Sequence, residues 1–317
     1  MTNKEMNYCY FRKQIVPLEK ATVNVSCQTM QYGSSCFSGI RGYYREGKVR
    51  LFRLRDHYER LMEGSKILGF DFFLEYEAFE KIIEDLVTTN TPEEDFYIRP
   101  FIFTEDDSLG PCFDTPLFDM SVYMKPLSNY YDPHKGLRMM ISSWRKMSDS
   151  SISVKAKAGG SYLNSSLATT EVKRCGYDEA LLMDQHGSIA EGSAANILIE
   201  YQGSIITPPL GAATLNGITM RTVVELLQSE GILVRFEPID RSMVYTCNEL
   251  ILTGTAAQVS FASSVDGREM GKSAPGKPGP LCQMLRGLFN EVLDMKSPFS
   301  DKWIREFSLS AEEASVV

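Results

Sequence analysis

The sequence predicts an α+β protein built from two domains, and three observations support this fold class. The 317 residues exceed what one ordinary hydrophobic core covers and suit two domains. Strand-like and helix-like patterns occur in both halves of the chain. Between the halves, residues 126–136 read PLSNYYDPHKG, which is rich in turn-forming residues. We therefore expect a small N-terminal α/β domain at 1–126, an interdomain loop at 127–136 and a larger C-terminal domain at 137–317.

The N-terminal half begins with a hairpin-like region. From residue 21 to 52, short apolar runs alternate with turn signals that include Gly39, Gly42 and Gly47. Apolar residues then recur at helical spacing over about 56–68, and a second helical pattern covers about 76–88. A strand at 96–103 completes an α+β lobe.

The C-terminal half reads as a meander of strands rather than repeated βαβ units. Strands are expected at 137–142, 180–184, 195–201 and 205–207, joined in part by tight turns. A helix follows Gly217, with Thr219 as its N-cap and Gly231 as its C-terminal stop. A strand at 249–252 and a helix at 281–295 come next, and the polar tail 296–317 is expected to be peripheral.

Composition excludes several classes of function. A net charge of −8 and a pI near 5.1 disfavour nucleic acid as a partner. No window is apolar enough to suggest a membrane span or a signal peptide. The seven cysteines are scattered and never spaced as CxxC, which indicates reduced thiols and a cytoplasmic protein. With three histidines and no close His/Cys grouping, no metal site is expected.

The segment ISVKAKAGGSY contains the first candidate for chemistry. If this segment were extended, Lys155 and Lys157 would share one face. Such lysines are usually solvated surface groups. However, Gly159 and Gly160 allow close approach to the backbone, and Tyr162 follows. A partly buried lysine beside a ligand can act as a Schiff-base nucleophile.

Four further positions have both an ordinary and a functional interpretation. Glu191 is either an exposed turn residue or a carboxylate paired with a pyridinium nitrogen. Thr219 and Thr255 either cap local structure or bind an anion beside free backbone N–H groups. Arg60, in LRDHYERL, either forms a surface ion pair or binds phosphate through its planar guanidinium.

Together these motifs resemble the class IV (fold type IV) enzymes that use pyridoxal 5′-phosphate (PLP), over about residues 32–293. The resemblance implies a D-amino acid aminotransferase-like fold, with a mostly antiparallel barrel-like sheet in a C-terminal PLP-binding domain. It selects Lys157 as the catalytic, Schiff-base lysine. The other cofactor-binding residues that it implies lie in the arginine helix and in KAGGSY, AEGSAANI, NGIT and TGTAA. They are Arg60, Tyr162, Glu191, Gly217, Ile218, Thr219 and Thr255.

Within this class, FYIRPF resembles the branched-chain aminotransferases. That resemblance implies that Tyr97 and Arg99 handle substrate carboxylates, and that the backbone N–H groups of Thr255 and Ala256 share the α-carboxylate. It further implies a homodimer. The remaining implied substrate contacts are Tyr32, which reaches a neighbouring subunit, and the side-chain pocket residues Phe37, Tyr130 and Tyr162.

Two segments depart from the family pattern. Pro126-Leu127-Ser128 stands where members often carry Pro-Trp-Gly, and the loop 106–111 (DDSLGP) differs from the usual small, Met-containing loop. Both changes concern substrate choice, so the sequence does not rank the amino donors.

The function implied by the resemblance is transfer of the amino group of leucine, isoleucine or valine to 2-oxoglutarate, giving a 2-oxo acid and glutamate. The alternatives are another class IV enzyme, such as a D-amino acid aminotransferase or an aminodeoxychorismate lyase, and a non-enzymatic scaffold. The branched-chain assignment is favoured over another class IV enzyme by Tyr97, Arg99 and Tyr162. A non-enzymatic scaffold is disfavoured because Lys157 and Glu191 are both present.

Overall fold

The computed structural model describes residues 6–113, 117–211, 213–271 and 276–309. The chain forms two compact units. The first comprises Met1–Ser128, Ala156–Gly160 and Val292–Val317, and the second comprises Asn129–Lys155 and Ser161–Glu291. The first unit therefore includes the Lys157 segment and the C-terminal segment, both of which follow residue 137 in the sequence.

Among the described residues, the first unit contains an eight-stranded sheet in the order β17-β5-β4-β6-β7-β1-β2, with β3 paired to β6. All of its strand pairings are antiparallel. Its strands are β1 (Tyr8–Phe11), β2 (Gln14–Pro17), β3 (Ser35–Phe37), β4 (Ile40–Arg45), β5 (Lys48–Phe52), β6 (Phe96–Thr104), β7 (Phe118–Pro126) and β17 (Ile304–Ser308). Its helices are α1 (Gln28–Tyr32), α2 (Leu54–Ile67), α3 (Tyr76–Asn90) and α8 (Ser300–Trp303), with a short 3-10 helix η1 (Leu18–Lys20).

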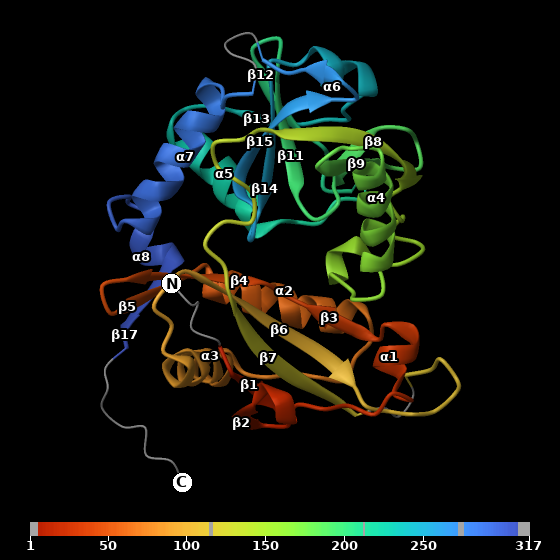
Figure 1. The fold of residues 1–317 in the computed structure, drawn as a ribbon, viewed down its shortest axis with the longest axis vertical. Helices are drawn as coiled ribbons and strands as arrows, with labels where there is room; N and C mark the ends of the chain where they lie inside the picture. The colour runs from red at the N-terminus through yellow and green to blue at the C-terminus, as the bar shows by residue number, and fades with distance from the viewer. Residues whose placement is uncertain (1–5, 114–116, 212, 272–275, 310–317) are drawn as a thin grey trace. The chain divides into compact units, whose positions relative to one another are not determined.

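Helices α2 and α3 cover this sheet because each has one apolar face (Figure 1). In α3, Phe79, Ile83 and Leu86 are fully buried at helical spacing. They pack in one cluster with alternate residues of β6, including Ile98 and Ile102. Both helices and the long strand lie where the sequence predicts them, within a few residues.

The prediction of a peripheral C-terminal tail is wrong for residues 296–309. Strand β17 pairs with β5 from Ile304↔Phe52 to Ser308↔Lys48. Trp303 is 2% exposed, and its carbonyl accepts the backbone N–H of Arg53 at 2.6 Å. The tail completes the first unit's sheet through partners about 250 positions earlier, which local sequence patterns do not reveal. Residues 310–317 lie outside the described residues.

The second unit contains a nine-stranded sheet, counted over the described residues, in the order β10-β9-β8-β15-β14-β11-β12-β13, with β16 paired to β15. The strands are β8 (Leu137–Arg145), β9 (Glu179–Met183), β10 (Ile189–Gly192), β11 (Asn196–Tyr201), β12 (Ser204–Thr207), β13 (Val234–Phe236), β14 (Glu249–Gly254), β15 (Gln258–Val265) and β16 (Arg268–Glu269). The helices are α4 (Tyr162–Arg174), α5 (Ile218–Ser229), α6 (Arg241–Thr246) and α7 (Pro280–Leu293), and the 3-10 helix η2 (Val154–Ala156) lies where the chain passes into the first unit.

This second sheet is mostly antiparallel, as predicted, but it is not a simple meander. Strands β8 and β9 pair in parallel, and helix α4 forms the crossover between them. The sequence pattern did not reveal α4, because only Ser165, Ala168 and Val172 form its buried stripe. A parallel pair requires such a crossover, so this part of the predicted meander is wrong.

Helix α5 begins one residue earlier than the predicted cap. Gly217 is the N-cap, without a side-chain capping hydrogen bond, and Thr219 lies inside the first turn with 4% of its surface exposed. The prediction of Thr219 as the N-cap is therefore wrong. Gly231 follows the helix with φ of 75°, the left-handed conformation expected of a C-terminal stop.

Within the residues that the structure describes, no helix has the length and apolarity to cross a membrane.

Candidate active site

Lys157 lies in the first unit, in a tight turn rather than in a strand. Its φ is 50°, a left-handed conformation that costs a non-glycine residue free energy. Backbone hydrogen bonds flank the turn, from Phe37 N–H to Lys157 O at 3.2 Å and from Gly159 N–H to Ser35 O at 2.7 Å. Lys155 is exposed whereas Lys157 is half-buried. The expectation of one shared lysine face is therefore wrong, and the structure separates the two lysines.

The glycines after Lys157 allow the chain's own β3 segment to approach closely. A Cβ atom on Gly159 would lie 2.3 Å from Ser35 Oγ, and one on Gly33 would lie 2.7 Å from Gly160 Cα. A side chain on Gly33 would press on the backbone of Gly160, whereas one on Gly159 would require the Ser35 hydroxyl to rotate away. The close approach of these two segments thus helps to place the lysine.

Phe37, Tyr97 and Arg99 gather beside Lys157 in the first unit. Lys157 Nζ lies 5.1 Å from the centre of the Phe37 ring, and the Arg99 guanidinium carbon lies 4.3 Å from it. Arg99 donates to Tyr97 Oη from Nη2 at 3.1 Å and from Nε at 3.3 Å. Gly39 leaves room for this tyrosine, because a Cβ there would lie 1.8 Å from Tyr97 Oη. The structure therefore brings four predicted site residues into one cluster.

Arg60 is 9% exposed on α2, which rules out the ordinary surface location. Its Nη2 lies 3.2 Å from Ser38 Oγ and 3.4 Å from His57 Nδ1, and these two atoms are 3.1 Å apart. Ser38 and His57 are themselves buried. They fix the guanidinium, and sequence reasoning missed both. The only available signal was the three-residue spacing of His57 and Arg60 on one helix face.

Tyr32 is the last residue of α1, and its backbone carbonyl lies close to Gly160 of the Lys157 segment. It is 43% exposed and donates its hydroxyl to Leu109 O at 2.7 Å. The buried Gln28 amide binds the same loop through Asp106 Oδ2 and Ser108 Oγ, both at 2.7 Å. Helix α1 and the atypical loop 106–111 therefore form one structural element.

Glu191 lies in the second unit, on β10, and is 5% exposed, so the exposed-turn interpretation is wrong. Its Oε2 accepts the Leu215 N–H at 3.0 Å and Asn196 Nδ2 at 3.2 Å. Its Oε1 lies 2.5 Å from Lys146 Nζ. Asn196 also donates to Leu215 O at 2.8 Å, which fixes its amide. Sequence reasoning missed Lys146 and Asn196, because strand register alone brings them to Glu191.

The start of α5 lies beside this carboxylate network. A Cβ on Gly217 would lie 1.9 Å from Asn196 Oδ1, so glycine is needed there. Ile218 and Thr219 follow in the first turn and are 1% and 4% exposed. The first backbone N–H groups of a helix and its dipole favour an anion, and no side chain caps this end.

Thr255 and Ala256 lie in the turn between β14 and β15, also in the second unit. Because β14 pairs with β11 at Asn196↔Thr253, this turn begins next to the Glu191 network. Ala256 and Tyr130 line one cavity of about 160 Å³. Tyr130 is 55% exposed, and Tyr162 is half-buried at the first position of α4.

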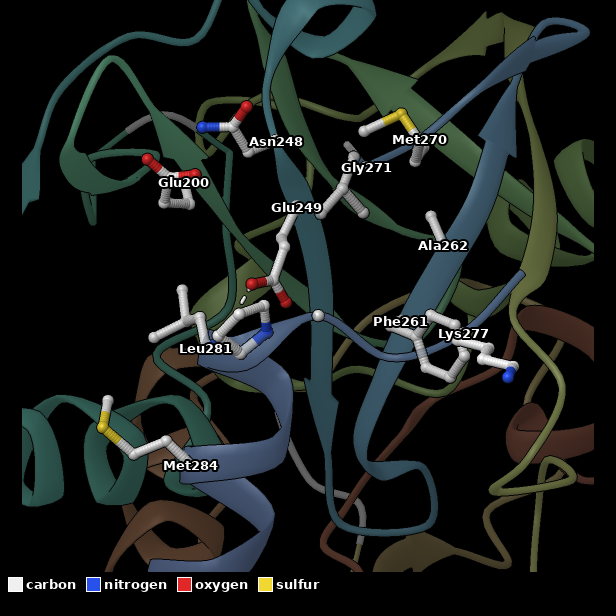
Figure 2. A pocket seen from close by; sticks show the side chains of 13 residues that line it. Glu200, Asn248, Glu249, Phe261, Ala262, Met270, Gly271, Lys277, Leu281 and Met284 are labelled. Atoms are coloured by element: carbon white, nitrogen blue, oxygen red, sulfur yellow. Dashed lines mark hydrogen bonds between the residues drawn. The ribbon is translucent and has the colours of Figure 1, made fainter. Parts of the chain in front are cut away.

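A larger cavity of about 470 Å³ in the second unit is lined by none of the predicted site residues. Figure 2 shows Glu249 pointing toward the first turn of α7, where its oxygens accept the backbone N–H groups of Leu281 at 2.8 Å and Cys282 at 3.1 Å. This carboxylate caps the helix and is already hydrogen-bonded. The cavity therefore contains none of the residues to which the predicted chemistry is assigned.

Comparison with known proteins decides the family. Residues 35–265 match the model of the amino-transferase class IV family. A probable branched-chain-amino-acid aminotransferase of Aquifex aeolicus is 35% identical over 302 residues, which cover 94% of this chain and 96% of the relative. The chain belongs to the class IV aminotransferases, among the branched-chain aminotransferases.

Solved structures agree with this assignment. A branched-chain aminotransferase from Thermoproteus uzoniensis, determined with norvaline, has a TM-score of 0.89 and 32% identity and covers 94% of this chain and 98% of its own. The T.th. branched-chain amino acid aminotransferase, complexed with N-(5′-phosphopyridoxyl)-L-glutamate, has a TM-score of 0.88 and 31% identity and covers 96% and 99%. The predicted fold type IV architecture of this aminotransferase is confirmed.

The side chains of this aminotransferase fit the chemistry of PLP. A carboxylate has about four acceptor positions, and three donors occupy the Glu191 carboxylate, which leaves room for a protonated ring nitrogen. The half-buried Lys157 amine suits an aldehyde, and the uncapped start of α5 suits a phosphate.

Proposed function

We propose that this aminotransferase uses PLP to transfer the amino group of L-leucine, L-isoleucine or L-valine to 2-oxoglutarate. The observation that carries the proposal is the placement of Lys157, half-buried against Phe37 and beside the Tyr97–Arg99 pair. The family supplies the reaction class. The norvaline and phosphopyridoxyl-glutamate ligands of the two solved relatives support the substrates.

The proposal gives each predicted cofactor-binding residue a role. The usual donors to a phosphate are guanidinium, hydroxyl and helix N–H groups. The phosphate is therefore bound by the guanidinium of Arg60, the hydroxyl groups of Thr219 and Thr255, and the N–H groups at Gly217, Ile218 and Thr219. Glu191 pairs with the ring nitrogen. Tyr162 donates to the phenolic oxygen. When bound, PLP supplies an electron sink for the pair of electrons released from the substrate Cα.

Lys157 performs the proton transfer. With PLP bound, the Lys157 amine would hold the cofactor aldehyde, and Nζ, once free, would take the proton from the substrate Cα and move it toward the cofactor. The turn at φ 50° fixes the backbone from which this side chain extends. A rigid backbone keeps the base at the distance that proton transfer requires.

Substrate binding follows from the charged and aromatic groups. Arg99, held by Tyr97, provides a cation for the carboxylates of the substrate, and the N–H groups of Thr255 and Ala256 share the α-carboxylate. The aromatic rings of Phe37, Tyr130 and Tyr162 suit a branched apolar side chain.

A homodimer in the cytoplasm completes the proposal. The apolar side chains of Val25, Met30 and Leu109 are 82%, 62% and 82% exposed, and the Tyr32–Leu109 hydrogen bond joins their two segments. A second copy of the chain covering this surface would bury them, and Tyr32 would then reach the partner's site. The free cysteines fit a reducing compartment.

An assay of stereochemistry tests the proposal. Purified protein with PLP is given L-leucine or D-alanine, each with 2-oxoglutarate, and glutamate formation is measured. We expect turnover of L-leucine and not of D-alanine, and we expect L-leucine but not D-alanine to bleach the yellow cofactor band. If D-alanine is turned over and L-leucine is not, the substrate assignment is overturned in favour of a D-amino acid aminotransferase. Light scattering of the same sample tests the dimer, and a monomer at micromolar concentration contradicts it.

A further inference from the structure

A second lysine lies, mostly shielded from solvent, beside the predicted ring-binding carboxylate. Lys146 Nζ lies 2.5 Å from Glu191 Oε1, and the two side chains are 12% and 6% exposed. Lys146 follows directly after β8, and its backbone N–H donates to Met183 O of β9 at 2.8 Å. Strand β9 in turn pairs with β10 through Leu182↔Glu191. The sheet itself therefore brings lysine and glutamate together.

Two register irregularities place these side chains. The β8–β9 pairing shifts between Ile141 and Arg145, just before Lys146, and the β9–β10 pairing shifts between Ile189 and Glu191. Such bulges redirect side chains and are common next to functional sites. Both members of the ion pair thus depend on a local departure from regular strand pairing.

Lys146 supplies the charge that a buried carboxylate needs. The other two donors, the Leu215 N–H and the Asn196 amide, are neutral and bind Oε2, while the ammonium binds Oε1. A buried ion without a counter-ion is costly. In the cofactor-free chain, the positive charge of Lys146 balances the negative charge of Glu191. The ion pair also holds the carboxylate in one orientation.

We propose that Lys146 is a positioning residue whose positive charge competes with that of the protonated ring nitrogen for the charge of Glu191, while an acceptor position stays open, and so sets how tightly the cofactor binds. This inference rests on the proposed role of Glu191. Lysine and glutamate together carry no net charge, so a pyridinium that joins them adds one uncompensated positive charge. Without Lys146, the pyridinium becomes the sole cation of the carboxylate and its binding gains strength.

The ion pair is first tested without cofactor. Thermal unfolding of the apoprotein is measured for Lys146→Met, Glu191→Gln and the double variant, with Lys155→Met as an exposed control. We expect each single change to lower the midpoint by about 5–15 °C, because it leaves one buried charge unpaired. The midpoint of the double variant should fall by less than the sum of the decreases in the two single variants. Additive losses, or losses no larger than that of Lys155→Met, overturn the ion pair.

The competition is tested by titrating PLP into each apoprotein and following absorbance. We expect Lys146→Met to bind PLP about tenfold more tightly or better, and its holoprotein to be destabilised less than its apoprotein. Lys146→Arg should bind PLP as the unmodified protein does, because it keeps the charge. Lys146→Gln removes the charge while keeping a polar side chain, and it serves if the methionine variant does not fold.

Unchanged or weaker PLP binding by both neutral variants overturns the competition and leaves Lys146 a purely structural role. Rejection of the competition can be distinguished from failure of the proposed function, because the unmodified protein still binds PLP in the first case. If the unmodified protein bound no PLP at all, the titration would reject the proposed function and the competition together. The unfolding midpoints of the unmodified apoprotein and its four variants would still decide separately whether Lys146 pairs with Glu191.

Discussion

Substitution of Gly217 by alanine should damage the Glu191 network without touching Glu191 itself. Its backbone φ of −69° and ψ of 132° suit alanine, so no backbone strain arises. The new Cβ would instead lie 1.9 Å from Asn196 Oδ1. The end of an asparagine side chain normally moves cheaply. This one is fixed, because its Nδ2 donates both to Glu191 at 3.2 Å and to Leu215 O at 2.8 Å.

The size of the effect follows from those two hydrogen bonds. One has a charged acceptor and one a neutral acceptor, so losing both costs about 2–4 kcal/mol. The corresponding decrease in the unfolding midpoint is about 4–16 °C. Differential scanning fluorimetry or circular dichroism of the apoprotein measures it directly.

Gly287→Ala is the matched control for this experiment. Gly287 is exposed on α7, and a Cβ there meets nothing within 4 Å. Alanine should leave the midpoint unchanged or raise it slightly, because alanine favours a helix by about 1 kcal/mol over glycine. If Gly217→Ala proves as stable as Gly287→Ala, the Asn196 amide does not fix the Glu191 carboxylate as described.

Two further predictions concern stability and thiol reactivity. Trp303→Ala should destabilise the protein by about 3–5 kcal/mol in urea unfolding. The reason is that this side chain is 2% exposed and stacks on the Phe299 ring, with the ring centres 4.4 Å apart. A loss of stability no larger than that caused by Trp144→Ala, at an exposed position, would refute the packing of the C-terminal segment. Burial raises the pKa of the Cys36 thiol to about 12, and only thiolates react rapidly. At pH 8, Ellman's reagent should therefore label the exposed Cys112 and Cys175 quickly in the native protein and the other thiols only after unfolding, whereas fast labelling of more than two thiols contradicts this prediction.

The elements that the sequence predicted well are those with a strong local pattern. The helix that follows Gly217 and stops before Gly231 carries a continuous apolar stripe, and it was found within a residue or two. The class of cofactor followed from short motifs around Lys157 and Glu191, because the residues that bind a cofactor stand close together in such motifs.

The parts that the sequence did not predict depend on distant partners. Trp303 looks like part of a polar tail, yet β17 joins a strand about 250 residues away. The weak apolar stripe of α4 concealed a crossover helix. Lys146 and Asn196 reach Glu191 through the register of neighbouring strands, which single-sequence patterns do not specify.

Identification of the lysine that carries the cofactor tests the central claim most directly. The protein is incubated with PLP, reduced with borohydride so that the link becomes permanent, digested and mapped by mass spectrometry, with Lys155→Ala and Lys157→Ala as paired variants. We predict phosphopyridoxyl label on Lys157 in the unmodified protein and in Lys155→Ala, and loss of specific label in Lys157→Ala. Stoichiometric label on Lys146 or Lys155 in the unmodified protein would contradict the assignment of Lys157.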